Sequence, residues 1–206
     1  MNILKDGNKQ NTQMYTIINY QKSSYIITVH RPIFERKISG LFQALSEPND
    51  YNKIFNIPKI ENISLDNLLS FFKNHLLDAD FENYDPIEEL LNYYNKDIPK
   101  NFFNFEKKYG IIKISENINI LVLRFKDIKC WDKILSQVFN KQITLHSVNN
   151  TNDKKISNMY EQFKLLIKER DVFSDYYIKE YNSIFFSECY NTSDCVELKK
   201  NWCNSL

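Results

Sequence analysis

The chain has 206 residues, of which 27 are Lys or Arg and 26 are Asp or Glu, so its formal net charge is +1. This balance provides no global field that would attract nucleic acid, so we expect no nucleic-acid partner and only a local anion site. The chain contains no apolar run as long as a membrane span, and its 4 cysteines show no CxxC spacing. We therefore expect a cytoplasmic protein with free thiols and no metal site.

The first strands are predicted close to the N-terminus, after a polar and loose arm at residues 1–13. Residues 14–18 favour a short strand, and a polar turn separates it from residues 25–29, a β-branched run typical of a strand covered on both faces. Pro32 fits the first position of a helix and disfavours a helical conformation for Arg31. Arg31 is therefore expected where a strand ends and a helix begins.

This position is chemically informative, because ligands of open α/β sheets collect beyond the carboxyl ends of strands, and helix N-termini attract anions. The guanidinium of Arg31 suits a phosphate, and Ser39 lies roughly 12 Å further along the predicted helix. Arg31 would have to fold along the helix for both side chains to reach one phosphate. The alternative is an ordinary strand and helix with a solvated arginine, and we interpret Arg36 and Lys37 as solvated charges.

Helices are predicted through the middle of the chain, after an irregular stretch at residues 47–62. Ser64 can cap a helix, and Asp85 can cap another one with Pro86 at its first position and Glu88 reaching back. Two apolar stripes support these helices: Leu65, Leu68, Leu69, Phe72 and Leu76 in the first, and Ile87, Leu90, Leu91 and Tyr94 in the second.

Two further strands, at residues 110–115 and 118–125, predict a hairpin that is followed by a helix over about 128–139. The alternation of strands with helices favours a mainly parallel sheet. Arg124 ends the second of these strands and could be another anion contact. A salt bridge between Arg124 and Asp127 is an equally good interpretation.

The C-terminal part is predicted to be helical, with one clear helix over residues 156–167 and two short helices over 174–202. Lys154 and Lys155 are expected in the loop before the first of them, where a solvated pair is one interpretation and a basic loop over a ligand another. No histidine has a spacing typical of a triad or a metal site, so a catalytic base stays unknown: His30, His75 and His146.

One stretch resembles a known motif, in which an arginine at a strand end is followed by a proline and, eight residues after the arginine, by a serine. This is the 3′-phosphate-binding motif of sulfotransferases, which use 3′-phosphoadenosine 5′-phosphosulfate. The stretch is more similar to the capsular polysaccharide synthesis protein family, a bacterial sulfotransferase-like family with a P-loop-type fold, whose run reads much like Val-Arg-x-Pro-x-x-Arg-x-Ile-Ser-x-x-Phe-Gln. Four residues keep that spacing: Arg31, Arg36, Ile38 and Ser39. His30 is inserted before the arginine, and Pro32 comes one place early.

The resemblance continues collinearly to Trp202. Residues 121–128 resemble a family strand ending in Leu-Arg-x-Glu-Asp-Leu, with Lys126 where an acidic residue is usual. Residues 149–164 resemble the family's Asn-rich loop, lysine and Tyr-x-x-Phe-Lys helix, and 181–183 match a terminal Tyr-Asn-Ser.

The resemblance implies an α/β, sulfotransferase-like three-layer fold with a mainly parallel sheet, in one domain at 1–206 with a core at 14–150 and a helical part at 151–206. It implies transfer of sulfate from 3′-phosphoadenosine 5′-phosphosulfate to a hydroxyl of a capsular or surface polysaccharide, without a metal. The implied nucleotide contacts are Arg31, Ser39, Arg124, Lys154 and Lys155.

The family's phosphosulfate-binding loop, which contains Gly, Ser and Lys, lies upstream of the arginine motif. Only Gly7 is found there in this chain, and no upstream histidine matches the catalytic one of many members. We therefore expect the first β-loop-α unit to be missing, in a truncated gene product or a degenerate paralogue. The alternative to a transferase is then a non-catalytic nucleotide-binding or interaction protein of the same fold.

Overall fold

The computed structural model of the chain describes residues 3–4, 15–46, 63–77, 85–146, 154–181 and 184–203. The chain divides into two compact units that interleave along the sequence, and each is described by itself. The first unit comprises residues 1–31, 84–146 and 184–191, and the second comprises 32–83, 147–183 and 192–206. This division does not test the prediction of one domain. The irregular stretch at 47–62 and most of the expected arm lie outside the described residues, so the missing β-loop-α unit stays a prediction.

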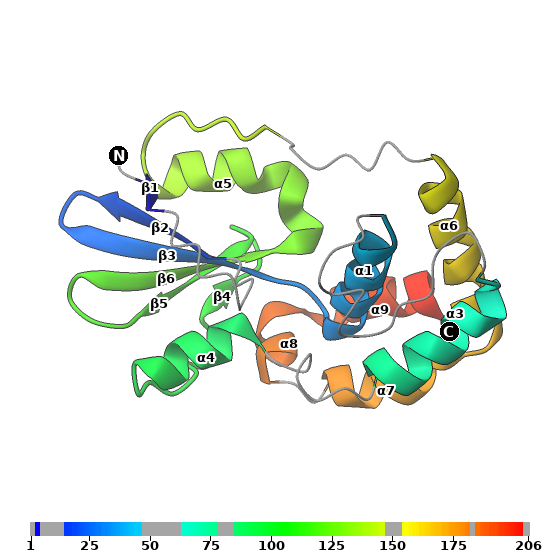
Figure 1. Cartoon of the computed structure of the whole chain (residues 1–206). Helices are drawn as coiled ribbons and strands as arrows, with labels where there is room; N and C mark the ends of the chain where they lie inside the picture. Colours follow the sequence, from blue (N-terminus) through cyan, green and yellow to red (C-terminus); the bar gives the residue numbers. More distant parts are fainter. Residues whose placement is uncertain are drawn as a thin grey trace. The chain divides into compact units, whose positions relative to one another are not determined.

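The first unit is built on a mixed sheet, whose strand order in the described residues is β1-β2-β3-β6-β5-β4 (Figure 1). In chain order the strands are β1 (Ile3–Leu4), β2 (Tyr15–Tyr20), β3 (Ser23–His30), β4 (Phe103–Asn104), β5 (Tyr109–Lys113) and β6 (Ile118–Arg124). The pair β3–β6 is parallel, and the other described pairs are antiparallel. The α/β class is therefore confirmed, whereas the prediction of a mainly parallel sheet is wrong.

Short connections explain why antiparallel pairing dominates, because a parallel pair needs a long crossover between its strands. The polar turn expected at residues 19–24 is reduced to residues 21–22, since Asn19 pairs with Ser24 and accepts a 2.6 Å hydrogen bond from the Ser24 hydroxyl. The predicted hairpin between β5 and β6 is confirmed. β1 pairs with β2, so the N-terminal arm is not loose throughout.

Helices cover both faces of this sheet. On one face, Ile134 and Leu135 of α5 (Trp131–Val138) pack against Leu121 and Leu123 of β6. A 3₁₀ segment, η4 (Phe125–Cys130), occupies the start of the stretch predicted as helix. The other face carries α4 (Pro86–Tyr93), which contacts β3, and α8 (Ile184–Cys189).

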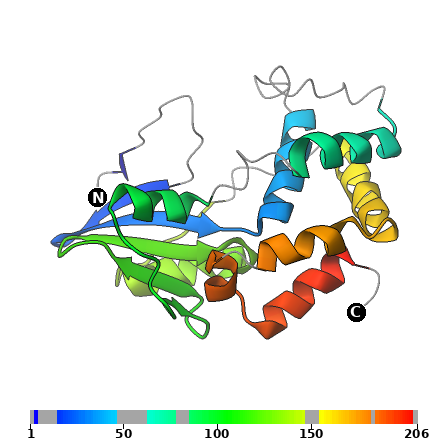
Figure 2. The ribbon, with the colours of Figure 1, turned by 90° about the horizontal axis from the view of Figure 1, so that it is seen from below.

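The second unit consists of helices in the part of it that is described (Figure 2). They are α1 (Ile33–Ser46), α3 (Leu65–Phe71) with its π-helical continuation η2 (Phe72–Leu77), α6 (Lys154–Glu169), α7 (Val172–Tyr181) and α9 (Thr192–Trp202). Phe34 of α1 is fully buried, and its ring contacts the rings of Phe72, Phe173, Tyr176 and Trp202. An aromatic core thus joins α1 to helices far away in the sequence.

The predicted N-cap residues Ser64 and Asp85 are confirmed, one in each unit, and the return contact of Glu88 stays a prediction. The Ser64 hydroxyl accepts a hydrogen bond from the backbone N–H of Asn67, and the carboxylate of Asp85 accepts one from the N–H of Ile87. The C-terminal stretch contains three helices, α7, α8 and α9, rather than the two expected, and α8 belongs to the first unit. Among the described helices, none has the length and apolar character needed to cross a membrane.

Candidate functional site

The candidate site lies in the first unit, at the carboxyl ends of the two parallel strands. His30 ends β3, Arg124 ends β6, and the two residues are partners in the parallel register. Side chains of paired residues point to the same face of a sheet, and this is the face that carries α4 and α8. His30 is 3% exposed and Arg124 is 4% exposed, so both lie inside the protein.

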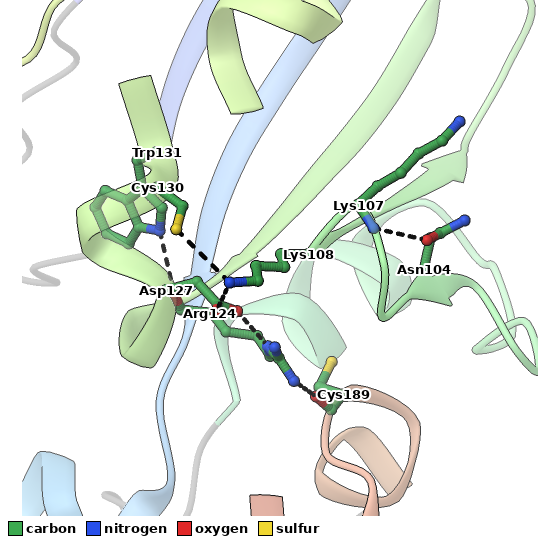
Figure 3. A network of polar contacts seen from close by, with 8 residues as sticks. All are labelled: Asn104, Lys107, Lys108, Arg124, Asp127, Cys130, Trp131 and Cys189. Carbon is green, nitrogen blue, oxygen red and sulfur yellow. Dashed lines mark hydrogen bonds and ion pairs between the residues drawn. The ribbon is translucent and has the colours of Figure 1, made fainter. Parts of the chain in front are cut away.

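Arg124 is held by an ion pair and by a backbone carbonyl (Figure 3). Its Nε donates a 2.6 Å hydrogen bond to Asp127, which is also buried, and its Nη1 donates a 3.0 Å hydrogen bond to the carbonyl of Cys189. Lys108 lies beside them, with its Nζ 3.8 Å from the second carboxylate oxygen of Asp127. The guanidinium also lies 4.8 Å from the ring centre of Phe103. The salt bridge that the sequence allowed for Arg124 is therefore present, and an anion would have to compete with it.

His30 lies beside a second buried carboxylate, that of Asp85. Its Nε2 lies 3.2 Å from the carboxylate oxygen Oδ2, while the other oxygen of Asp85 caps α4. The Nδ1 of His30 and the hydroxyl of Thr28, two residues earlier on the same face, are buried without a hydrogen-bond partner among the described residues. Buried polar atoms of this kind commonly hold an ordered water molecule.

Cys189 contributes its thiol to this interior as well as its carbonyl. Burial raises the pKa of the Cys189 thiol well above its usual range, the charge of Asp85 raises it further, and Arg124 opposes this effect. The thiol therefore stays protonated and is a poor nucleophile at neutral pH.

Arg31 follows His30 and lies over the ring of Phe125, with 4.3 Å between the guanidinium carbon and the ring centre. Its side chain is half-buried, and the ring of Phe125 is 36% exposed. A guanidinium that contacts an aromatic ring keeps its charge and its N–H groups. Among the predicted phosphate contacts, Arg31 is therefore the one that lies over an aromatic ring at the end of β3.

The N-terminus of α1, in the second unit, holds a carboxylate of the chain itself. Glu180 of α7 accepts a 2.8 Å hydrogen bond from the backbone N–H of Ile33 and a 2.9 Å hydrogen bond from that of Phe34. Glu180 is 1% exposed. Its two carboxylate oxygens thus occupy the place where we expected an anionic ligand.

The remaining predicted contacts also belong to the second unit. Ser39 is half-buried on α1, and Lys154 and Lys155 are the first residues of α6 rather than a loop before it. The interpretation of Lys37 as a solvated charge is wrong. It is 2% exposed, and its ammonium donates hydrogen bonds to the carbonyls of Leu76 and Leu77 at the end of η2. The predicted contacts are therefore divided between the units, with Arg31 and Arg124 in the first.

Sequence reasoning missed Glu180 and Lys108, which carry no local motif. Glu180 is 147 residues from the N–H of Ile33, and Lys108 and Cys130 are 22 residues apart.

Among the described residues, no three His, Cys, Asp or Glu side chains gather in a way that could hold a metal ion.

Comparisons with protein-family models, curated proteins and solved structures found no match to this chain. The function is therefore inferred from the geometry of the two units. In the first unit, the Arg124–Asp127 ion pair and the His30–Asp85 contact lie at the carboxyl ends of the parallel strands, where α/β proteins bind ligands. In the second unit, a carboxylate occupies the N-terminus of a helix.

Proposed function

We propose that this chain is a sulfotransferase-like protein that binds a 3′-phosphorylated adenine nucleotide and does not transfer sulfate. The observation that carries the proposal is the position of Glu180. A helix N-terminus binds a phosphate through free backbone N–H groups, and those of Ile33 and Phe34 are already bonded to the Glu180 carboxylate. A buried negative charge at this place also repels a second anion.

The contacts of Arg31 support weak binding of a phosphate. The ring of Phe125 contacts the guanidinium and helps to position it, and a guanidinium can bind two phosphate oxygens at once. Arg124 is less suited to this role because it is buried and paired with Asp127. The 3′-phosphate would therefore depend on Arg31.

Isothermal titration calorimetry with adenosine 3′,5′-bisphosphate tests this proposal. Arg31→Ala should weaken binding by roughly 1.5 to 3 kcal/mol, the value of a hydrogen bond to a charged group, which is about tenfold or more in Kd. Arg36→Ala removes an equal charge from α1 and should leave Kd unchanged. The proposal fails if the full chain does not bind the nucleotide at millimolar concentration, or if Arg31→Ala binds it equally well.

A second candidate function is sulfate transfer from 3′-phosphoadenosine 5′-phosphosulfate to a polysaccharide hydroxyl, and the pair His30–Asp85 favours it. A histidine oriented by a carboxylate is the common arrangement of a general base, although the burial of His30 keeps it from a large acceptor. A screen of polysaccharide acceptors with labelled donor separates the two candidates. Turnover by the full chain that is lost in His30→Gln would replace our first proposal with this one.

A further inference from the structure

An amine and a thiol meet at the edge of the charged cluster in the first unit. The Nζ of Lys108 lies 3.7 Å from the Sγ of Cys130, to which it donates a hydrogen bond (Figure 3). Lys108 belongs to the turn between β4 and β5, and Cys130 ends η4. The two side chains therefore come from different elements, and their ends contact each other.

The amine is positioned by its own turn and by a carboxylate. The backbone of Lys108 has a φ of 63°, and its N–H donates a 2.7 Å hydrogen bond to the carbonyl of Asn104. The side chain of Asn104 accepts a further hydrogen bond from the N–H of Lys107. The carboxylate of Asp127 also lies 3.8 Å from the ammonium, so the amine contacts both a carboxylate and a sulfur of η4.

Solvent reaches both partners. The side chain of Lys108 is 44% exposed and Cys130 is half-buried, whereas Cys189 and Cys195 are buried. Cysteines that react with peroxides are accessible and lie beside a cationic group. Cys130 meets both conditions. Its sulfenic acid would form within reach of an amine, and a sulfenic acid is known to condense with a backbone nitrogen to give a sulfenamide.

We propose that peroxide oxidation of Cys130 leads to a covalent S–N bond with Lys108. The thiolate of Cys130 attacks one oxygen of hydrogen peroxide, so that an S–O bond forms, the O–O bond breaks, and the other oxygen leaves as water after taking up the thiol proton. The ammonium of Lys108 releases one proton to solvent, and the neutral amine attacks the sulfur. The S–N bond forms, the S–O bond breaks, and hydroxide leaves as water with a second proton from the nitrogen.

The step balances in atoms and electrons. The thiol and the amine together lose two hydrogen atoms, and one molecule of peroxide is reduced to two molecules of water. The bond joins the β4–β5 turn to η4 and removes the positive charge of Lys108 from Asp127. An excess of a small thiol reverses it and restores both side chains. The modification depends on this pair alone and is independent of nucleotide binding.

Mass spectrometry of the full chain after exposure to hydrogen peroxide tests the proposal. Digestion should give a pair of peptides joined through Lys108 and Cys130 that is two hydrogen atoms lighter than its parts and that separates on treatment with dithiothreitol. Lys108→Arg keeps the positive charge but should abolish the link, so that dimedone captures the sulfenic acid of Cys130. Lys107→Arg changes the neighbouring lysine and should form the link as the unmodified chain does.

Three results would overturn the proposal. In the first, Cys130 of the unmodified chain is captured by dimedone as fully as in Lys108→Arg. In the second, the joined peptides carry an additional oxygen atom. In the third, Cys130 does not react with peroxide before the buried cysteines do.

Discussion

Replacement of Glu180 probes the feature on which the proposed function rests. Glu180→Ala removes both acceptors from the N-terminus of α1 and leaves the N–H groups of Ile33 and Phe34 without their partner. Glu180→Gln keeps one carbonyl oxygen as an acceptor but removes the negative charge. The two variants therefore separate the hydrogen bonds from the charge.

The expected loss follows from the two bonds and the charge. An unsatisfied buried N–H costs about 1 to 3 kcal/mol, and loss of a negative charge at a partly buried helix N-terminus costs up to about 2 kcal/mol. Water that enters the vacated space offsets part of this cost. We expect Glu180→Ala to lower the free energy of unfolding by about 3 kcal/mol and Glu180→Gln by about half as much.

Urea unfolding followed by tryptophan fluorescence measures these changes. The chain has 2 tryptophans, and Trp202 is the one in the second unit, so a Trp131→Phe background makes the signal specific to that unit. Asp66→Ala is the control in the same unit, because Asp66 forms an exposed ion pair with Arg170 and its loss should cost less than about 1 kcal/mol. A Glu180→Ala variant within about 0.5 kcal/mol of its parent would refute the reasoning.

The remaining predictions concern packing and a buried thiol. Gly110→Ala should destabilise the first unit by about 1 to 3 kcal/mol, because the added Cβ would lie 2.5 Å from a ring carbon of Phe102, and urea unfolding measures this loss. Gly40→Ala places its Cβ in open space on α1 and should instead stabilise by up to about 1 kcal/mol, so equal effects at the two positions would contradict the packing argument. Because burial raises the pKa of Cys189, the folded thiol stays protonated at a pH of about 8.5, where an exposed thiol is half ionised. The stability that the protonated Cys189 thiol contributes is complete below that pH and is lost as the pH rises toward the raised pKa of the folded state. Iodoacetamide should therefore modify Cys189 only after unfolding. Rapid labelling of Cys189 in the folded chain would contradict this.

Local patterns predicted the elements that local chemistry decides. The caps at Ser64 and Asp85 were predictable because each side chain bonds a backbone N–H two or three residues away. The hairpin of β5 and β6 was predictable for the same reason, since its strands are joined by a short polar turn. The direction of the sheet was mispredicted because the alternation of strands with helices favours parallel pairing, whereas the pairs β2–β3, β4–β5 and β5–β6 are joined by short turns and are antiparallel.

The partners of the charged side chains were not predictable, because they depend on contacts between distant segments. The sequence places Arg31 and Lys37 close together, but the structure gives one an aromatic ring and the other two carbonyl groups. Nothing near Glu180 indicates that it caps a helix 147 residues away. Motif reasoning therefore located a helix N-terminus but could not foresee that the chain fills it with its own carboxylate.

The most direct test of the account is an NMR titration of the ¹⁵N-labelled full chain with adenosine 3′,5′-bisphosphate. The account predicts that the side-chain Nε–H signal of Arg31 shifts as the nucleotide binds, while the backbone amide signals of Ile33 and Phe34 stay in place because Glu180 keeps them bonded. Saturable shifts of the Ile33 and Phe34 amides, with no change at Arg31, would contradict it, since the nucleotide would then displace Glu180 from α1.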